Sequence, residues 1–328
     1  MKQLRIAING FGRIGRIFFR QAYENPNFNI VAINDLGSKE NLLYLLRHDS
    51  VYGKYETAIS KELVFLSERD PASLPWKDMN IDVVVEATGV FESYEKAKAH
   101  LSAGAKRVVI TAPVKDDDAK TFTPNVGVDM VGLSAITSNA SCTTNATTPV
   151  AAVMLGTVGI VKAVLNTVHG YTASQALVDS PMEKDFRRGR AAAQNIVPSS
   201  TGAAIATAKA IPGMRDLFDG IAMRVPVISG SLVDFTFVSK RKTNVEEINN
   251  IFKEAEKRDE WKGILKTTDE PIVSSDIIGD PYGAIVDLNM TRVVDGDLVK
   301  ILSWYDNEWG YSAMLAKHVE SLATFLSA

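Results

Sequence analysis

Cysteine is almost absent from this sequence, because Cys142 is the only one among 328 residues. A single cysteine excludes a disulfide within the chain. This usage is typical of a reducing compartment, so we expect a cytoplasmic protein. Long apolar runs are also absent, since none approaches the roughly 18 residues that a membrane-spanning helix needs. The opening residues, MKQLRIAINGFG, lack the apolar block of a signal peptide. The sequence therefore predicts no membrane partner.

The chain has no strong excess of either charge. Lys and Arg number 36 and Asp and Glu 39, which gives a net charge of −3 at pH 7. This balance provides no general attraction to nucleic acid, and we predict neither a nucleic-acid partner nor a bound metal. The length and the 46% hydrophobic content are typical of a globular protein with two domains.

The first part of the chain, up to about residue 141, alternates between β-rich runs and segments with helical periodicity. Several of the β-rich runs are apolar at consecutive positions, as in strands that are buried on both faces of a parallel sheet. This order predicts an α/β fold with a Rossmann-type, doubly wound parallel sheet. The expected strands are 4–10, 28–35, 81–89, 106–113 and 134–141, and the expected helices are 13–25, 38–50 and 92–104.

The pattern changes after Cys142. Residues 231–240, 284–294 and 297–306 alternate in the manner of antiparallel strands, and Asp295-Gly296 forms a hairpin signal. A helix over 244–257 would place Val245, Ile248, Ile251, Phe252 and Ala255 on one face, and 310–328 reads as one long amphipathic helix. We expect a second, α+β domain with a mixed or antiparallel sheet.

The segment INGFGRIGR contains Gly10, Gly12 and Gly15 in the order G-x-G-x-x-G. It follows an expected strand and opens an expected helix, which is the context that makes this spacing a dinucleotide signal. Asp35 ends the next strand, where an acid binds a ribose 2′-hydroxyl and disfavours the extra phosphate of NADP. These residues predict NAD as the cofactor. The alternative is a glycine turn followed by an ordinary strand-end aspartate.

Cys142 has small polar neighbours in the segment SNASCTTN and precedes residues that can form a helix. A helix N-terminus stabilises a thiolate, so we expect a reactive cysteine; the alternative is a buried, inert one. Among four histidines, His169 ends an expected strand and is the candidate base for this thiol. His48, His100 and His318 lie in charged helical contexts and are expected at the surface.

Several side chains suited to anions follow in the same part of the chain. Arg224 is expected at the start of a strand, FRRGR supplies three further arginines, and Thr201 and Gly202 lie in PSSTGAA. Each arginine alone could be a solvated surface charge. As a group they favour a substrate that carries phosphate.

Seven segments together resemble phosphorylating glyceraldehyde-3-phosphate dehydrogenase, and the resemblance runs in register over essentially the whole chain. They are INGFGRIGR, ERDP, EATGVF, SNASCTTN, STGAA, MRVP and SWYDNEWGYS. The resemblance implies an NAD-binding domain of residues 1–141 with the C-terminal helix 307–328, and a catalytic domain of residues 142–306. It also implies a homotetramer whose long loop, roughly 172–195, lies between subunits.

The resemblance implies oxidation of glyceraldehyde 3-phosphate with inorganic phosphate to 1,3-bisphosphoglycerate, a reaction of glycolysis and gluconeogenesis. Cys142 would form the thioester and His169 would be its base. Residues implied to bind NAD are Gly10, Gly12, Arg13, Ile14, Gly15, Asp35, Arg69, Thr88, Thr111, Asn307 and Tyr311. Residues implied to bind substrate phosphate are Thr172, Arg188 and Arg224, and those for inorganic phosphate are Ser141, Thr143, Thr201 and Gly202.

Four points depart from the family pattern or stay open. Ala146 stands where the family often has a second cysteine, and Arg187 or Arg190 could replace Arg188 as the phosphate ligand. Erythrose-4-phosphate dehydrogenase shares the fold, the thiol and the base, and releases its acyl group to water. A catalytically silent dinucleotide-binding or RNA-binding protein is the alternative from another class.

Overall fold

The computed structural model describes residues 3–326, which divide into two compact units. One unit comprises residues 1–141 and 312–328, and the other comprises residues 142–311. The second boundary falls inside helix α7 (Trp309–Ser321), whereas the sequence analysis placed it at residue 307. Within the described residues, no helix is long and apolar enough to cross a membrane.

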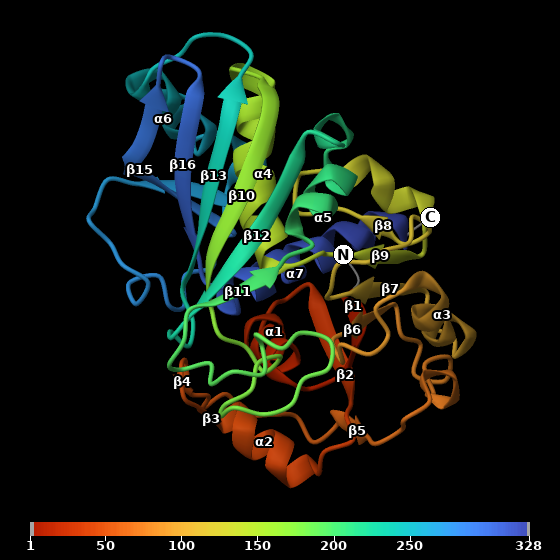
Figure 1. Cartoon of the computed structure of the whole chain (residues 1–328). Helices are drawn as coiled ribbons and strands as arrows, with labels where there is room; N and C mark the ends of the chain where they lie inside the picture. Colours follow the sequence, from red (N-terminus) through yellow and green to blue (C-terminus); the bar gives the residue numbers. More distant parts are fainter. Residues whose placement is uncertain (1–2, 327–328) are drawn as a thin grey trace. The chain divides into compact units, whose positions relative to one another are not determined.

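The first unit contains a parallel sheet of seven strands in the order β5-β2-β1-β6-β7-β9-β8 (Figure 1). This arrangement confirms the expected Rossmann-type fold. The order reverses between β1 and β6, which is where open α/β sheets bind ligands at the carboxyl ends of their strands. The strands are β1 (Leu4–Asn9), β2 (Phe28–Asn34), β5 (Val64–Leu66), β6 (Val83–Glu86), β7 (Arg107–Ile110), β8 (Lys120–Thr121) and β9 (Ile136–Ser138).

Both faces of this sheet are covered, because successive side chains of a strand point to opposite faces. Ile6 and Ile8 belong to a core formed with helix α1 (Arg13–Ala22) and the part of α7 that lies in this unit. Ala7 and Val84 belong to a second core with helix α3 (Tyr94–Ser102) and Trp76. The remaining elements of the unit are α2 (Lys39–Arg47), β3 (His48–Asp49), β4 (Gly53–Lys54), η1 (Pro71–Ser73), η2 (Val128–Leu133) and η5 (Leu322–Phe325).

The second unit contains a mixed sheet of seven strands in the order β11-β12-β10-β13-β16-β15-β14, as the sequence predicts for this part of the chain (Figure 1). Helix α4 (Cys142–Thr157) packs on the sheet and contacts α5 (Ala203–Ala210) and α6 (Val245–Ala255). The strands are β10 (Ile160–Gly170), β11 (Val197–Ser200), β12 (Phe218–Val225), β13 (Ser231–Ser239), β14 (Leu265–Thr268), β15 (Ala284–Val294) and β16 (Leu298–Tyr305), with short helices η3 (Pro212–Met214) and η4 (Asp259–Trp261).

The predicted local signals of the second unit are mostly confirmed. Asp295 and Gly296 have φ of 48° and 73°, as a hairpin turn between β15 and β16 requires. Helix α6 buries Ile248, Phe252 and Ala255, whereas Val245 at its first position is exposed.

Three expectations are wrong. His100 and His318 are fully buried, because the faces of α3 and α7 that carry them pack onto the parallel sheet; only His48 is exposed. Arg224 lies at the end of β12 rather than at its start, since the strand begins at Phe218. The expected helix 310–328 ends at Ser321 and continues as the short helix η5, while residues 327–328 lie outside the described part of the chain.

Candidate active site

Cys142 and His169 face each other in the second unit. Cys142 is the first residue of α4, and His169 lies near the end of β10. The Sγ of Cys142 is 3.3 Å from Nε2 of His169, within the range in which a thiol and an imidazole share a proton. Cys142 is partly exposed and His169 is 3% exposed. The sequence therefore identified two residues that the fold brings into contact.

The surroundings of the pair oppose charge on both groups. Burial raises the pKa of the Cys142 thiol above its usual value, although Arg224 and hydrogen bonds from Thr143 act in the opposite direction. Burial, followed by the charge of Arg224, lowers the pKa of His169 to about 3. Arg224 and Thr143 are therefore the groups that favour a thiolate on Cys142, whereas burial opposes it.

Nδ1 of His169 has two competing neighbours. The carbonyl oxygen of Gly170 and Nη1 of Arg224 each lie 2.6 Å from it. A carbonyl oxygen only accepts and a guanidinium only donates, so a given tautomer satisfies one of them. With its proton on Nδ1, the imidazole bonds to Gly170 and leaves Nε2 free to accept the thiol proton of Cys142. The position of Arg224 thus controls whether His169 can act as a base.

Tyr305, at the end of β16, is a site residue that the sequence analysis missed. Its hydroxyl lies 2.9 Å from Oγ1 of Thr143 and 2.8 Å from Oγ1 of Thr167, which joins β16 to α4 and β10. Its ring stands edge-on to His169, with ring centroids 6.0 Å apart. Burial raises the pKa of Tyr305 well above its usual value, so the hydroxyl stays protonated. Tyr305 supports the nucleophile-bearing turn of α4 and one side of the imidazole.

Two serines near β13 hold Asn307. Ser231 accepts a hydrogen bond from the backbone N–H of Gly170 at 3.1 Å and donates to Oδ1 of Asn307 at 2.8 Å. Ser229 donates to Oδ1 of the buried Asp306, which also accepts from two backbone N–H groups at the start of α7. These bonds connect Asn307 to the end of the strand that carries His169. Tyr311, the other residue expected to lie near the nicotinamide, is the third residue of α7 and is buried.

Arg188 and Arg224 are the two arginines whose charges act on the imidazole of His169. Arg224 pairs directly with His169 across β10 and β12, and the charge of Arg188 contributes to lowering the pKa of His169. Nε of Arg188 donates to Oγ of Ser199 at 2.7 Å, which fixes the side chain against β11. Arg190 instead pairs with Asp179 at the surface. Within residues 3–326, the side chain of Arg187 forms neither a hydrogen bond nor an ion pair.

The hydroxyls expected at the phosphate sites differ in their surroundings. Thr143 is buried and its hydroxyl contacts Tyr305. Thr172 is half-buried beside Ser174, and Ser141 directly precedes Cys142. Gly202 is the N-cap residue of α5, with open space where a side chain would stand, and the Thr201 hydroxyl accepts from the N–H of Ala203. The start of α5 therefore has open space at Gly202, while the first N–H of the helix is capped by the Thr201 hydroxyl.

The glycine turn lies in the first unit between β1 and α1. Gly10 has φ of 94°, and a Cβ added there would come within 2.6 Å of the backbone nitrogen of Thr88. A Cβ at Gly15 would lie 2.1 Å from the carbonyl oxygen of Gly10, whereas a Cβ at Gly12 meets nothing within 4 Å. Gly10 and Gly15 are thus required by packing, and Gly12 leaves space beside the first turn of α1. This is the division of roles in a dinucleotide-binding turn.

A cavity of about 340 Å³ opens beside this turn. The carboxylate of Asp35 is held at its edge by the N–H groups of Phe11 at 2.7 Å and Gly37 at 2.8 Å. Arg13 and Ile14 begin α1, and the guanidinium of Arg13 is paired with Asp49. The predicted residues that line the cavity are Gly10, Gly12, Asp35, Arg69 and Thr88.

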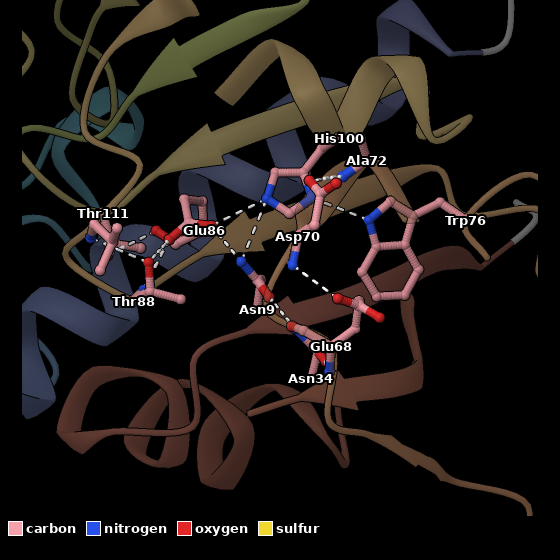
Figure 2. A network of polar contacts seen from close by, with 11 residues as sticks. Asn9, Asn34, Glu68, Asp70, Ala72, Trp76, Glu86, Thr88, His100 and Thr111 are labelled. Atoms are coloured by element: carbon pink, nitrogen blue, oxygen red, sulfur yellow. Dashed lines mark hydrogen bonds and ion pairs between the residues drawn. The ribbon is translucent and has the colours of Figure 1, made fainter. Parts of the chain in front are cut away.

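Polar side chains continue behind the cavity, in a network drawn in Figure 2. Glu86 at the end of β6 accepts hydrogen bonds through its carboxylate from Thr88 and through its backbone oxygen from Thr111. Both threonines were expected in the cofactor groove. Glu86 and its partners Asn9 and His100 were not, although Asn9 and Glu86 are polar residues within the largely apolar expected strands 4–10 and 81–89.

A Rossmann-type sheet with this glycine turn, and a cysteine in contact with a histidine, define an NAD-dependent oxidoreductase with a thiol nucleophile. Two family models match: "Glyceraldehyde 3-phosphate dehydrogenase, NAD binding domain" over residues 4–94 and "Glyceraldehyde 3-phosphate dehydrogenase, C-terminal domain" over residues 141–307. The chain belongs to the glyceraldehyde-3-phosphate dehydrogenase family.

Individual relatives agree with the family models over nearly their whole length. Glyceraldehyde-3-phosphate dehydrogenase of Zymomonas mobilis is 43% identical, with 98% of this chain and 99% of the relative covered. That of Streptomyces coelicolor is 45% identical, with 95% and 96% covered. That of Geobacillus stearothermophilus is 43% identical, with 99% and 98% covered. These relatives support the dehydrogenase over the erythrose-4-phosphate enzyme and over a silent binding protein.

Proposed function

We propose that this chain oxidises glyceraldehyde 3-phosphate with NAD and inorganic phosphate, and that the product is 1,3-bisphosphoglycerate. The observation that carries this proposal is the 3.3 Å contact between Sγ of Cys142 and Nε2 of His169 in a chain of this family. The thiol is the nucleophile and the imidazole is its base.

The residues of the first unit fit a dinucleotide. The uncovered space at Gly12 and the N-terminus of α1 suit a pyrophosphate, and Asp35 suits an adenosine ribose hydroxyl. Arg69 lines the same cavity and would bind the adenine, and Asn307 and Tyr311 would bind the nicotinamide. When bound, NAD accepts a hydride from the substrate.

Cys142 and His169 handle the protons of the reaction. The sulfur attacks the aldehyde carbon while Nε2 of His169 accepts the thiol proton, which then moves to the alkoxide oxygen and completes a hemithioacetal. His169 next accepts the hydroxyl proton as hydride leaves the same carbon, and a thioester of Cys142 results. An oxygen of inorganic phosphate then attacks the thioester carbonyl, the sulfur leaves, and the acyl phosphate is released. Gly170 holds the imidazole of His169 throughout, and Tyr305 holds Thr143, the residue that follows Cys142.

Two anion sites are required, because substrate and co-substrate each carry a phosphate. Arg224, Arg188 and Thr172 bind the phosphate of the substrate. Nε of Arg224 has no protein partner within residues 3–326, so it is available to an anion. An anion that draws Arg224 away from Nδ1 of His169 also favours the tautomer in which Nε2 is a base. The inorganic phosphate site comprises Ser141, Thr143, Thr201 and Gly202.

We also propose that the protein is a cytoplasmic homotetramer. The single cysteine suits a reducing compartment. The loop between β10 and β11 exposes large apolar side chains, of which Phe186 is 82% and Leu177 78% exposed, and burial against another subunit would remove them from water.

A steady-state assay tests the activity. We expect NADH formation from glyceraldehyde 3-phosphate that depends on inorganic phosphate, with NAD strongly preferred to NADP because of Asp35. Oxidation of erythrose 4-phosphate to the free acid without a phosphate requirement would overturn the proposal in favour of the related enzyme. The absence of aldehyde oxidation altogether would favour a binding protein.

A further inference from the structure

The carboxyl ends of three neighbouring strands carry a row of buried polar side chains. Asn34, Asn9 and Glu86 end β2, β1 and β6, and they stand in register across the point where the strand order reverses. Strand alternation directs all three to the sheet face that packs against α3. Their exposed fractions are 4%, 1% and 2%.

The direction of every hydrogen bond on one side of the row is fixed. The backbone N–H of Glu68 donates to Oδ1 of Asn34 at 2.8 Å, so Nδ2 of Asn34 must be the atom that donates to Oδ1 of Asn9 at 2.7 Å. Nδ2 of Asn9 in turn donates to Oε2 of Glu86 at 2.6 Å. The chain of donors therefore ends at the carboxylate (Figure 2).

The directions of the hydrogen bonds on the other side of the row, at Trp76 and His100, are also determined. The indole Nε1–H of Trp76 can only donate, and it donates to Nδ1 of His100 at 3.0 Å. His100 is consequently a neutral imidazole with its proton on Nε2, which lies 3.0 Å from Oε2 of Glu86. The 3.4 Å contact between Nε2 of His100 and Nδ2 of Asn9 then joins two donors that converge on the same oxygen.

Glu86 thus receives donors from both sides and holds two threonines. Oε1 accepts from the N–H and the hydroxyl of Thr88, and the backbone oxygen of Glu86 accepts from the N–H and the hydroxyl of Thr111. The four groups that bond the carboxylate, from Thr88, Asn9 and His100, all donate to it.

Some residues of this hydrogen-bond network line the cavity beside the glycine turn. Asn9, Asn34, Glu68 and Thr88 line the cavity, whereas Glu86, His100 and Trp76 lie behind it. The nitrogen of Thr88 is also the atom against which Gly10 packs. A change at Glu86 therefore reaches the cavity wall through Asn9 and Thr88 without any contact between Glu86 and a ligand.

We propose that Glu86 is the positioning residue of the NAD pocket, and that His100, in its neutral Nε2–H form, anchors it. The inference rests on the proposed location of NAD in this cavity. Its consequence is specific: loss of the acceptor at Glu86 weakens cofactor binding, while the groups that carry out the chemistry keep their arrangement.

Glu86→Gln tests this proposal, because it keeps the size of the side chain and replaces one acceptor with a donor. All four partners of the carboxylate donate, and neither Thr88 N–H nor His100 can reverse its role while Trp76 donates to Nδ1. We expect the Kd for NAD alone, measured by calorimetric titration, to rise at least about tenfold. The KM for NAD should rise in parallel, and kcat at saturating NAD should change by less than about threefold.

Asp82→Asn is the matched control. Asp82 directly precedes β6, is 5% exposed, and accepts from the N–H of Arg5 and from Lys106 at the opposite end of the strand. The Tm of this variant should fall by about as much as that of Glu86→Gln. Its Kd for NAD should stay within about twofold of that of the original chain. The proposal would be overturned if Glu86→Gln bound NAD as tightly as the original chain, or if both variants lost the same affinity for NAD. Either result would leave the location of the cofactor unaffected. An original chain that binds no NAD would overturn the location of the cofactor as well.

A measurement on the original chain covers the case in which Glu86→Gln fails to fold. Nitrogen-15 spectra of histidine-labelled protein, assigned with His100→Gln, should show His100 neutral and protonated on Nε2 around neutral pH. An Nδ1–H tautomer or an imidazolium would contradict the hydrogen-bond directions and overturn the proposal.

Discussion

Nε2 of His169 lies 3.3 Å from Sγ of Cys142, and the opposite nitrogen of the same ring lies 2.6 Å from the guanidinium of Arg224. The imidazole thus connects the nucleophile with a side chain suited to substrate phosphate. Burial and the charge of Arg224 lower the pKa of His169, so its neutral imidazole is available to take a proton during the attack.

His169→Asn removes the base and leaves Cys142 in place. We expect kcat to fall by about 10²- to 10⁴-fold, the usual contribution of a general base, while the Kd for NAD stays unchanged. The rate of the first turnover, followed as NADH absorbance, measures the effect on hydride transfer directly. A first-turnover rate within tenfold of the original would show that His169 is not the base.

The arginine that binds substrate phosphate can be identified with a matched pair. Arg188→Leu should raise the KM for glyceraldehyde 3-phosphate by about 10- to 100-fold, since a hydrogen bond to a charged group contributes about 1.5–3 kcal/mol. Arg190→Leu only breaks an exposed ion pair with Asp179 and should leave the KM within about twofold. The reverse result would assign the phosphate to Arg190.

Gly12, the N-cap of α1, and Gly15, in the first turn of α1, should respond differently to a single methyl group. Gly15→Ala places a Cβ against the backbone of Gly10 and should lower the free energy of unfolding by about 1–3 kcal/mol or more. Gly12→Ala meets open space, so its Tm should match the original chain while its affinity for NAD falls. Thermal unfolding and NAD titration of both variants check this. Unchanged NAD binding in Gly12→Ala would place the pyrophosphate elsewhere.

His318 makes the fold sensitive to acid. Its imidazole stacks on Phe122 at 3.7 Å between ring centroids, and burial lowers its pKa to about 3. A histidine in the unfolded chain takes up a proton near pH 6.5, so this contribution to stability is lost as the pH falls from about 6.5 towards 3, by up to about 1.4 kcal/mol per pH unit.

Denaturant unfolding between pH 7 and pH 5 measures this loss. His318→Gln should reduce the pH dependence, because the neutral amide has no proton to take up. The slope that remains should include His169, whose pKa is lowered in the same direction. A slope that is the same with and without His318 would contradict the assignment.

The sequence predicted those features that depend on local order along the chain. The parallel strands, the glycine turn and Asp35 follow one another within one βαβ unit, so their spacing alone locates them. Cys142 and His169 were identified because both stand at the ends of elements with polar neighbours. They were proposed as a nucleophile and its base from their residue types, and the family resemblance supported this pairing, since nothing local determines which strand lies beside α4.

The features that were missed depend on packing between distant segments. His100 stands among Glu95, Lys96 and Lys98, which suggests a solvated helix face, yet it faces Trp76 from another segment. Tyr305 has the pattern of a core residue, and its hydroxyl acquires a role only through Thr143 and Thr167. The competition between Gly170 and Arg224 for one nitrogen depends on angles that no sequence pattern specifies.

The central claim is that Cys142 carries the substrate as a thioester that phosphate then cleaves. Mass spectrometry of the intact chain, mixed with NAD and glyceraldehyde 3-phosphate without inorganic phosphate, tests it most directly. We predict a phosphoglyceroyl group on Cys142 that accumulates within one turnover and disappears when phosphate is added. NADH formation without any adduct on Cys142, or an adduct that phosphate does not discharge, would contradict the account.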